Sequence, residues 1–281
     1  VHIMAEKAWD QYGSGSEDDL ANAICHAVDR GADILSNSWG GLGESNLIYE
    51  AVQYAHDHGT LVIAAGGNDV TECKHYPAAY AEVVAVTATD KSDKPAWFTN
   101  FGYWVEVAAP GVSVYSTWWN DTYESASGTS MSAPHVAGVA ALSWSQFPDM
   151  TRDQVRAQLR YTADDLGDPG FDECYGYGRV NARRAVEQAL PEHDVGLLYW
   201  KIPGVSKPFD TVTINSSLLN FGTSNESDIM VQLMVNGSVA DSEFVNHLAS
   251  GASTSISLAW NPVVEGKYNV TLCVEPMHGE I

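Results

Sequence analysis

Two kinds of hydrophobic periodicity divide the chain near residue 192. Up to that point, apolar side chains recur at helical spacing in stretches such as 20–28 and 45–58, and short continuous apolar runs lie between them. Strands are predicted at residues 2–7, 34–38, 61–65 and 83–87, and the last two are the most apolar, as is typical of buried strands. Because strands and helices alternate, the pattern predicts an α/β fold with a doubly wound parallel sheet.

Beyond residue 192 the helical periodicity disappears and short alternating stretches follow. They include GLLYWKIP, TVTINSSLLNFG, MVQLMVNG, STSISLAW and GKYNVTLCVEP, separated by turn residues. This spacing is typical of an all-β immunoglobulin-like sandwich. We therefore divide the chain into an α/β domain, residues 1–192, and a β module, residues 193–281. We expect the first to lack its N-terminal part and the second to lack its final strand.

One stretch of small and apolar residues, GTSMSAPHVAG at 128–138, predicts a helix that begins close to Ser130. The following positions are apolar or small on nearly every side, as in a buried central helix. We place Pro134 in its first turn, where a proline costs no hydrogen bond. A serine at a helix start is most often an N-cap. Its hydroxyl also lies where unpaired N–H groups stabilise negative charge, as a nucleophile that attacks a carbonyl requires.

The same eleven residues resemble the nucleophile motif of the subtilisin-like serine proteases, the subtilases, and further similarity extends over about residues 1–190. The resemblance implies a serine endopeptidase that hydrolyses peptide bonds with Ser130 as its nucleophile. It also implies that Asn68 is the oxyanion-hole side chain and donates together with the backbone N–H of Ser130. Without that context, Asn68 would be interpreted as an asparagine in a turn.

The resemblance further implies two backbone edges that clamp an extended peptide by strand addition, which makes binding tolerant of sequence. The substrate-binding residues are Ser38, Trp39 and Gly40 on one edge, Gly13, Ser14 and Gly15 on the other, and Ala65 with Gly66. Trp39 as a pocket wall favours medium or large apolar side chains, but it is also consistent with plain core packing. The glycine-rich edge is equally consistent with a flexible turn. Asp69 and His75 are expected at the rim of the same pocket.

The sequence lacks the general base and the acid that such a serine needs. Subtilases carry them in the order Asp, His, Ser, and no DTG, DSG or HGTH motif is present. His58 closes a helix instead of opening one, and His135 lies about 7 Å further along the helix of Ser130. We therefore expect the Asp and His to lie upstream of Val1 and residues 1–281 to be inactive alone. The alternative is a catalytically inactive subtilase fold that serves as a scaffold or surface binding protein.

Composition narrows the partners and the location. With 36 Asp and Glu against 14 Lys and Arg, the formal charge is −22, which disfavours nucleic acid as a partner. This charge fits a halophilic source and an ordinary acidic secreted protein equally well. No apolar run reaches 18 residues, so we expect no membrane span. Glycosylation sequons in the β module, which resembles a CARDB adhesion module, fit a secreted or cell-surface protein that binds polypeptide substrates and an extracellular polymer.

Metal and cysteine chemistry remain open in the sequence. No cofactor is certain, and the resemblance implies at most a structural calcium. Its candidate ligands are the carbonyls of Ala78, Tyr80 and Val83 with the carboxylate of Glu106. The four cysteines show no CxxC spacing, which disfavours zinc. Cys25 is expected as a buried hydrophobe, whereas Cys73 and Cys174 fall in loops and could pair in an oxidising compartment, although the sequence alone does not pair them.

Overall fold

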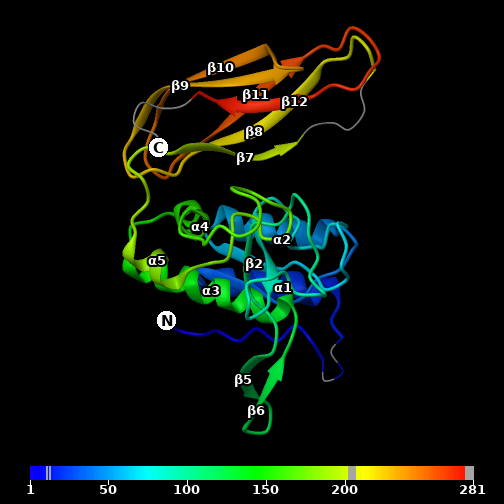
Figure 1. Cartoon of the computed structure of the whole chain (residues 1–281), viewed down its shortest axis with the longest axis vertical. Coiled ribbons are helices and arrows are strands. Elements are labelled where there is room, and N and C mark those ends of the chain that lie inside the picture. Colours follow the sequence, from blue (N-terminus) through cyan, green and yellow to red (C-terminus); the bar gives the residue numbers. More distant parts are fainter. Residues whose placement is uncertain (11, 13, 202–206, 276–281) are drawn as a thin grey trace. The chain divides into compact units, whose positions relative to one another are not determined.

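The computed structural model describes residues 1–10, 12, 14–201 and 207–275 and, for residues 199–201, the backbone alone. It divides into two compact units, Val1–Ala189 and Leu190–Ile281, which are described in turn. In the first unit, four strands form one parallel sheet in the order β1-β2-β3-β4. They span Ile34–Asn37 (β1), Leu61–Ala65 (β2), Val83–Thr89 (β3) and Val107–Pro110 (β4). The predicted α/β class with a parallel sheet is confirmed (Figure 1).

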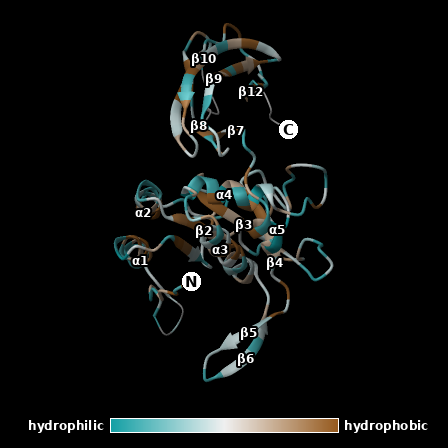
Figure 2. Ribbon diagram, turned by 90° about the vertical axis from the view of Figure 1, so that its left-hand side faces the viewer, coloured by the Kyte–Doolittle hydropathy of each residue, from teal (hydrophilic) through white to brown (hydrophobic). Residues whose placement is uncertain are grey.

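Helices cover both faces of this sheet. One face carries α1 (Glu17–Asp29) and α2 (Asn46–Asp57), and the other carries α3 (Thr129–Gln146), α4 (Arg152–Tyr161) and α5 (Ala182–Glu187). Alternate residues of β2 point to opposite faces: Leu61 and Ile63 join the core with α3, and Val62 and Ala64 join the core with α1 and α2. Figure 2 shows these hydrophobic strands in brown between the helices. The carboxyl ends of the parallel strands therefore meet at one edge, where α/β proteins bind ligands.

The helix starts follow local signals in the sequence. Ser16 and Asp19 form a reciprocal capping box at α1, with the Asp19 N–H donating to Ser16 Oγ at 3.2 Å. Ser45 caps α2 by accepting the Ile48 N–H at 3.4 Å. Within the described part of the chain, no helix is both long enough and apolar enough to cross a membrane.

The strand expected at residues 2–7 is wrong. This segment has no ladder partner and lies exposed, with Ile3 94% accessible. Among the described residues, β1 pairs with β2 on one side only, so its other edge carries no strand. A segment becomes a strand only where a neighbour takes its N–H and C=O groups, and residues 2–7 have no such neighbour among the described residues.

A two-stranded antiparallel ribbon leads into α3. It consists of β5 (Val114–Trp118) and β6 (Thr122–Ala126) and extends away from the sheet (Figure 1). Its side chains are largely exposed, and Tyr115 stacks on Tyr123 with ring centroids 5.7 Å apart. The ribbon returns the chain to the carboxyl edge of the sheet immediately before Ser130.

The second unit is a sandwich of two antiparallel sheets, ordered β10-β9-β12 and β11-β8-β7. The strands span Val195–Lys201 (β7), Val212–Asn220 (β8), Glu226–Val235 (β9), Ser238–Leu248 (β10), Ser253–Trp260 (β11) and Val270–Val274 (β12). The predicted immunoglobulin-like sandwich is confirmed, with Leu218, Ile229 and Leu233 at the centre of its core. β10 was not predicted, because this edge strand is mostly polar and exposed.

Candidate active site

Ser130 lies in the first turn of α3, as predicted. The helix begins at Thr129, and its N-cap, Gly128, offers no side chain to cap the first N–H groups. As the second residue of the helix, Ser130 has a backbone N–H without a partner inside the helix. Ser130 itself is half-buried. The helix start therefore presents a hydroxyl and an uncapped N–H side by side.

Pro134 is in the second turn of α3 and not in the first, which corrects the expectation. A proline has no N–H, so the carbonyl of Ser130, four residues earlier, receives no hydrogen bond from the helix. The hydroxyl of Ser38 supplies that bond, because its Oγ lies 2.8 Å from the Ser130 carbonyl oxygen. In return, Ser130 Oγ donates to the carbonyl of Ser38 at 3.2 Å. This reciprocal pair fixes the end of β1 to the start of α3 and explains why the proline is tolerated there.

Asn68 lies just beyond the carboxyl end of β2 and is held by its oxygen. Its Oδ1 accepts the Thr129 N–H at 2.8 Å and the Thr129 hydroxyl at 3.1 Å. The buried Thr129 Oγ1 also accepts the N–H of Gly67 at 3.1 Å. With Oδ1 occupied in this way, the Nδ2 group of Asn68 is directed elsewhere. The side chain is exposed, so Nδ2 can donate to a ligand.

The two predicted oxyanion donors converge on one point in front of Gly128. A Cβ built on Gly128 would lie 3.6 Å from Asn68 Nδ2 and 3.7 Å from the backbone nitrogen of Ser130. Because residue 128 has no side chain, this space is open. Two N–H donors that border the same small space can stabilise a negative oxygen that forms beside Ser130 Oγ.

Asn100 holds the loop that carries Asn68, and the sequence analysis missed it. The fully buried side chain accepts the Asp69 N–H at 2.8 Å and donates from Nδ2 to the Gly66 carbonyl at 3.0 Å. Its backbone N–H also donates to the carbonyl of Gly67 at 3.1 Å. The one signal in the sequence was an amide within the aromatic stretch WFTNFGYW.

His75 fills the crevice between the ends of β1 and β2. A Cβ on Gly40 would lie 2.6 Å from His75 Nε2, and a Cβ on Gly67 would lie 2.9 Å from its ring, so neither position accepts a larger residue without movement. Burial lowers the pKa of the His75 imidazole below its ordinary value of 6.5, and the charge of Asp69 opposes this shift. The ring is therefore neutral at neutral pH.

The remaining residues predicted on this side of the site differ in surroundings. Ala65 is 3% accessible, and Gly66 donates its N–H to the Val86 carbonyl and accepts from Asn100, so both belong to the sheet end. Trp39 is half-buried and packs against the core of α1 and α2, as in the core-packing alternative.

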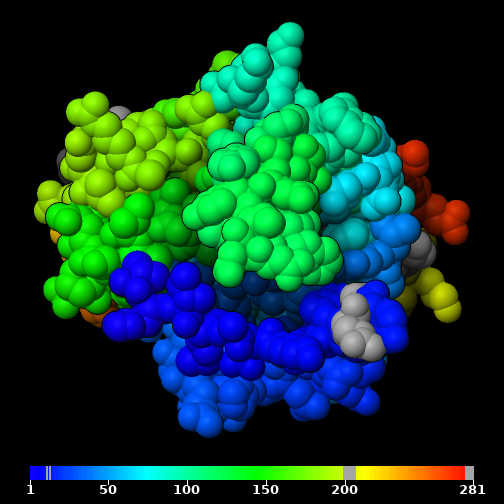
Figure 3. Space-filling view, turned by 90° about the horizontal axis from the view of Figure 1, so that it is seen from below, coloured from blue at the N-terminus to red at the C-terminus, as the bar shows by residue number. Residues whose placement is uncertain are grey.

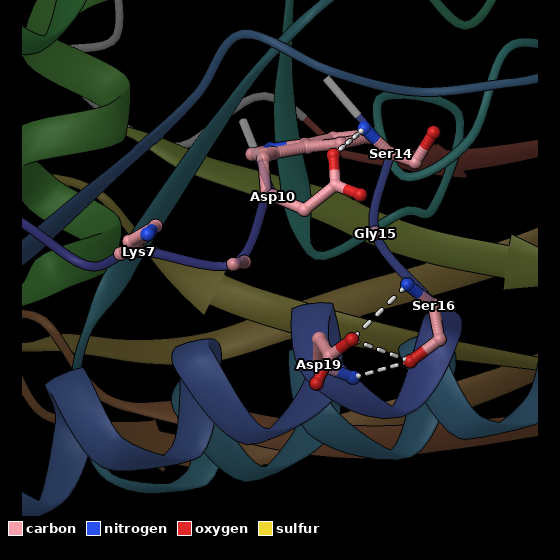
Figure 4. A pocket seen from close by; sticks show the side chains of 8 residues that line it. Lys7, Asp10, Ser14, Gly15, Ser16 and Asp19 are labelled. Atoms are coloured by element: carbon pink, nitrogen blue, oxygen red, sulfur yellow. Dashed lines mark hydrogen bonds between the residues drawn. The ribbon is translucent and has the colours of Figure 1, made fainter. Parts of the chain in front are cut away.

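The predicted opposite edge, which includes Ser14 and Gly15, forms a local turn with residues 8–10. Ser14 donates its N–H to Asp10 Oδ1 at 2.9 Å, and its carbonyl accepts the Asp10 N–H at 2.8 Å (Figure 4). A Cβ on Gly15 would lie 2.5 Å from the carbonyl oxygen of Ala8. The structure thus brings Ser14 and Gly15 to residues 8–10 and not to Ser130. Gly13 lies outside the described residues.

No imidazole serves Ser130 in the described part of the chain. His135 Nδ1 lies 2.8 Å from the Met131 carbonyl, and His58 Nδ1 lies 2.8 Å from the Tyr54 carbonyl, so both rings are bound to their own helices. A cavity of about 1450 Å³ instead follows the unpaired edge of β1. Figure 3 shows the hollow from below, next to the N-terminal residues in blue. Its walls include Ile34, Asn37, Trp39, Pro134 and Ala137.

The candidate calcium ligands do not fit a cation. The Glu106 carboxylate accepts from Arg156 at 2.5 and 2.7 Å and from Arg160 at 2.6 Å. Arg156 also donates to the carbonyl of Val83 at 3.3 Å, and the Tyr80 carbonyl accepts the Val83 N–H at 3.1 Å. A guanidinium therefore uses two of the four candidate ligands, the Glu106 carboxylate and the Val83 carbonyl. Across the described residues, no group of three His, Cys, Asp or Glu side chains is placed to bind a metal.

Comparison with known proteins gives two family matches. The model of the subtilase family matches residues 1–178, which include Ser130 and Asn68. The CARDB model matches residues 201–278.

Individual relatives match over about two thirds of the chain. Thermitase of Thermoactinomyces vulgaris is 42% identical over 185 residues, which cover 66% of this chain and 65% of thermitase. The halolysin-like extracellular serine protease Nep of Natrialba magadii is 45% identical over 184 residues, 66% of this chain and 34% of Nep. A solved lanthipeptide protease superimposes with a TM-score of 0.60 at 28% identity, over 65% of this chain and 68% of its own. The chain thus spans less than two thirds of thermitase and about a third of Nep.

Proposed function

Because this chain belongs to the subtilase family, we propose that it is the nucleophile-bearing part of a secreted serine endopeptidase that hydrolyses peptide bonds at Ser130. The observation that carries the proposal is the convergence of Asn68 Nδ2 and the Ser130 N–H on the open space at Gly128. A merely structural helix start has no use for a second, side-chain donor held in place by Thr129 and Asn100. The extracellular protease among its relatives supports secretion.

In the proposed reaction, Ser130 Oγ attacks the carbonyl carbon of the scissile peptide bond and loses its proton to a general base. The carbonyl oxygen becomes negative and accepts hydrogen bonds from Asn68 Nδ2 and the Ser130 N–H. The base then returns the proton to the leaving amine, and water releases the acyl group from Ser130. Ser38 keeps the backbone of the nucleophile in place throughout, through its bond to the Ser130 carbonyl.

We assign the general base and its orienting acid to a histidine and an aspartate upstream of Val1. The support is the lack of an imidazole at Ser130 in the described chain, together with the open cavity along the free edge of β1. Polypeptide that added a strand to this edge would fill the cavity and reach the region of Ser38. The same pairing would give residues 2–7 the neighbour that they lack.

Substrate is expected to bind as an extended peptide along Ser38, Trp39 and Gly40, with main-chain hydrogen bonds that tolerate many sequences. Ala65 and Gly66 provide the floor beside this edge, and Trp39 is the apolar wall. On this proposal Ser14 and Gly15 form the opposite edge only after their turn with Asp10 has opened. The β-sandwich is proposed to hold the enzyme to a cell surface or an extracellular polymer.

Labelling with a fluorophosphonate tests the proposal. Residues 1–281 alone should hydrolyse no peptide and react little, because nothing deprotonates Ser130, whereas a chain extended upstream should do both. The label should fall in the tryptic peptide 92–152, which contains Ser130. Serine-dependent turnover by residues 1–281 alone would contradict the assignment of the base. An extended chain with intact motifs that neither reacts nor cleaves would favour the inactive scaffold.

Replacing Asn68 with leucine in the extended, active enzyme should lower kcat by about 10²- to 10³-fold, the size of this effect in subtilisin itself, with little change in KM. The reason is that Nδ2 binds the oxygen only after it has become negative. Steady-state kinetics with a peptide substrate provide the measurement. Thr129→Ser, which keeps the hydroxyl that contacts Asn68, is the matched control and should leave kcat close to the parent value. An equal fall in kcat in both variants would mean that the loss comes from disturbed packing of the loop and not from the missing Nδ2 donor.

A further inference from the structure

Two cysteines that the proposed reaction does not use lie in loops on either side of the turn at residues 101–104. Cys73 is in the loop that follows Asn68, and Cys174 is in the loop between α4 and α5. Residues 101–104 lie between these loops and bond to both. The Gly102 N–H donates to the carbonyl of Glu173 at 2.8 Å, and Trp104 Nε1 donates to the carbonyl of Glu72 at 3.2 Å. Each acceptor immediately precedes a cysteine.

Further contacts hold the same two loops together. Phe101 donates its N–H to the carbonyl of Thr71 at 3.2 Å. A hydrogen bond with the Glu173 carboxylate, together with the charges of Glu173 and Glu72, raises the pKa of the Tyr103 phenol. A Cβ on Gly102 would lie 3.5 Å from the Glu72 carbonyl oxygen, which shows how closely the turn approaches that loop. The backbones that carry the two thiols therefore flank a single residue.

The surroundings of the thiols suit a cross-link. Cys73 is exposed and reachable by a soluble reagent. Cys174 is half-buried on a fixed backbone, with its N–H donating to Asp172 at 2.7 Å and its carbonyl accepting the Thr87 hydroxyl at 2.8 Å.

The other two cysteines are placed differently. Cys25 is in α1 against the core, and Cys273 is in the β-sandwich, where its Sγ lies 3.8 Å from the Gln232 carbonyl.

We propose that Cys73 and Cys174 form a disulfide that ties the loop after Asn68 to the loop after α4. A disulfide oxidant such as oxidised glutathione forms it in two exchanges. The Cys73 thiolate attacks one glutathione sulfur and releases the first glutathione as thiolate. The Cys174 thiolate then attacks the Cys73 sulfur of the mixed disulfide and releases the second. Two electrons and two protons leave the cysteines and appear in two glutathione thiols.

The cross-link would act on the anion-binding side of the site. It closes a loop of about 100 residues, and long closed loops give the unfolded chain the largest loss of freedom. In the folded state the disulfide would fix the loop at Cys73, five residues after Asn68. Asn100 holds the start of the same loop through hydrogen bonds from the N–H groups of Asp69 and Thr71. The proposal concerns the thiols alone and stands or falls independently of the proposed peptidase activity.

Peptide mapping of the folded 281-residue chain tests the pairing directly. The protein is incubated with oxidised glutathione, alkylated without reduction and digested with trypsin, which places each cysteine in a separate peptide. The expected product is peptide 31–74 joined to peptide 161–179, with a mass lower than their sum by two hydrogens. Reduction before alkylation should abolish it, and Cys25 and Cys273 should be alkylated throughout. Alkylation of both Cys73 and Cys174 after oxidation, or their linkage to another cysteine, overturns the proposal.

Thermal unfolding gives a second readout that does not depend on mass analysis. Reduction of the oxidised protein should lower the Tm of the first unit by on the order of 10 °C. The variant with both Cys73→Ser and Cys174→Ser should show no change on reduction, whereas the matched control with Cys25→Ala and Cys273→Ser should keep the full shift. Equal shifts in the two variants would contradict the pairing.

Discussion

Replacing Ser130 with alanine in the extended, active enzyme is expected to lower kcat by about 10⁶-fold, the order of magnitude that this loss has in subtilisin. The substitution removes the oxygen that forms the acyl bond, while the Ser130 N–H and Asn68 Nδ2 remain. The residual rate should therefore come from binding and anion stabilisation alone. Single-turnover and steady-state kinetics with a chromogenic peptide measure the loss, and fluorophosphonate labelling of peptide 92–152 should disappear.

Ser143→Ala is the matched control for this experiment. Ser143 lies in the same helix, is fully buried and has an Oγ with no hydrogen-bond partner among the described residues. Removing an unsatisfied buried hydroxyl is neutral or stabilising, so this variant should keep the parent activity. Retention of more than about one hundredth of the activity by Ser130→Ala would exclude Ser130 as the nucleophile.

Replacing Glu106 with alanine is expected to lower the free energy of unfolding of the first unit by about 3–5 kcal/mol, because it removes the buried carboxylate that pairs with two guanidinium groups. The side chains of Glu106 and Arg156 are 6% and 7% accessible, and that of Arg160 is 17% accessible. Urea unfolding followed by tryptophan fluorescence measures the change. Glu187→Ala on α5 is the matched control, since its pair with Arg183 is exposed and contributes about 0.3–0.5 kcal/mol.

The same cluster gives the first unit a dependence on acid. Burial alone would raise the pKa of Glu106, but the charges and hydrogen bonds of Arg156 and Arg160 outweigh it and hold the pKa below the ordinary value of 4.5. A carboxyl whose pKa is lowered by folding stabilises the protein above its unfolded value and loses that contribution as the pH falls through its folded value. The parent should therefore lose stability below about pH 4.5 more steeply than Glu106→Ala. Parallel curves for parent and variant would contradict the ion-pair assignment.

Elements with strong local signals were predictable from the sequence. The capping box at Ser16 and the buried run 61–65 specify α1 and β2 by themselves, and the structure has both. Residues 2–7 were also predicted as a strand but form none, because strand formation depends on a neighbour that no local pattern encodes. Pro134 was misplaced for a similar reason. In the second turn, Pro134 leaves the Ser130 carbonyl to the hydroxyl of Ser38, which follows β1 and lies 92 residues from Ser130 along the chain.

The residues of the candidate site that would touch a substrate were predictable from the sequence, but the contacts that hold them in place were not. Ser130 and Asn68 were found through the resemblance of short motifs, which name the residues that touch a substrate. Asn100 was missed because it acts through backbone contacts with residues 66–71, and such contacts leave no pattern in the sequence. Likewise, no local pattern indicated that Arg156, far away in sequence, donates to the Glu106 carboxylate and the Val83 carbonyl.

At this end of the sheet, three glycines are expected to tolerate substitution by alanine poorly, although alanine is usually a mild substitution. A single methyl group at Gly40 would press on the His75 ring, one at Gly67 would press on His75 and Asn100, and one at Gly128 would occupy the space between the two donors. Conservative exchange to alanine, the mildest change elsewhere in a protein, is therefore among the most harmful here. In a library of random variants selected for activity, we expect alanine to be depleted most strongly at these glycine positions. That depletion would locate the site better than the loss of charged residues would.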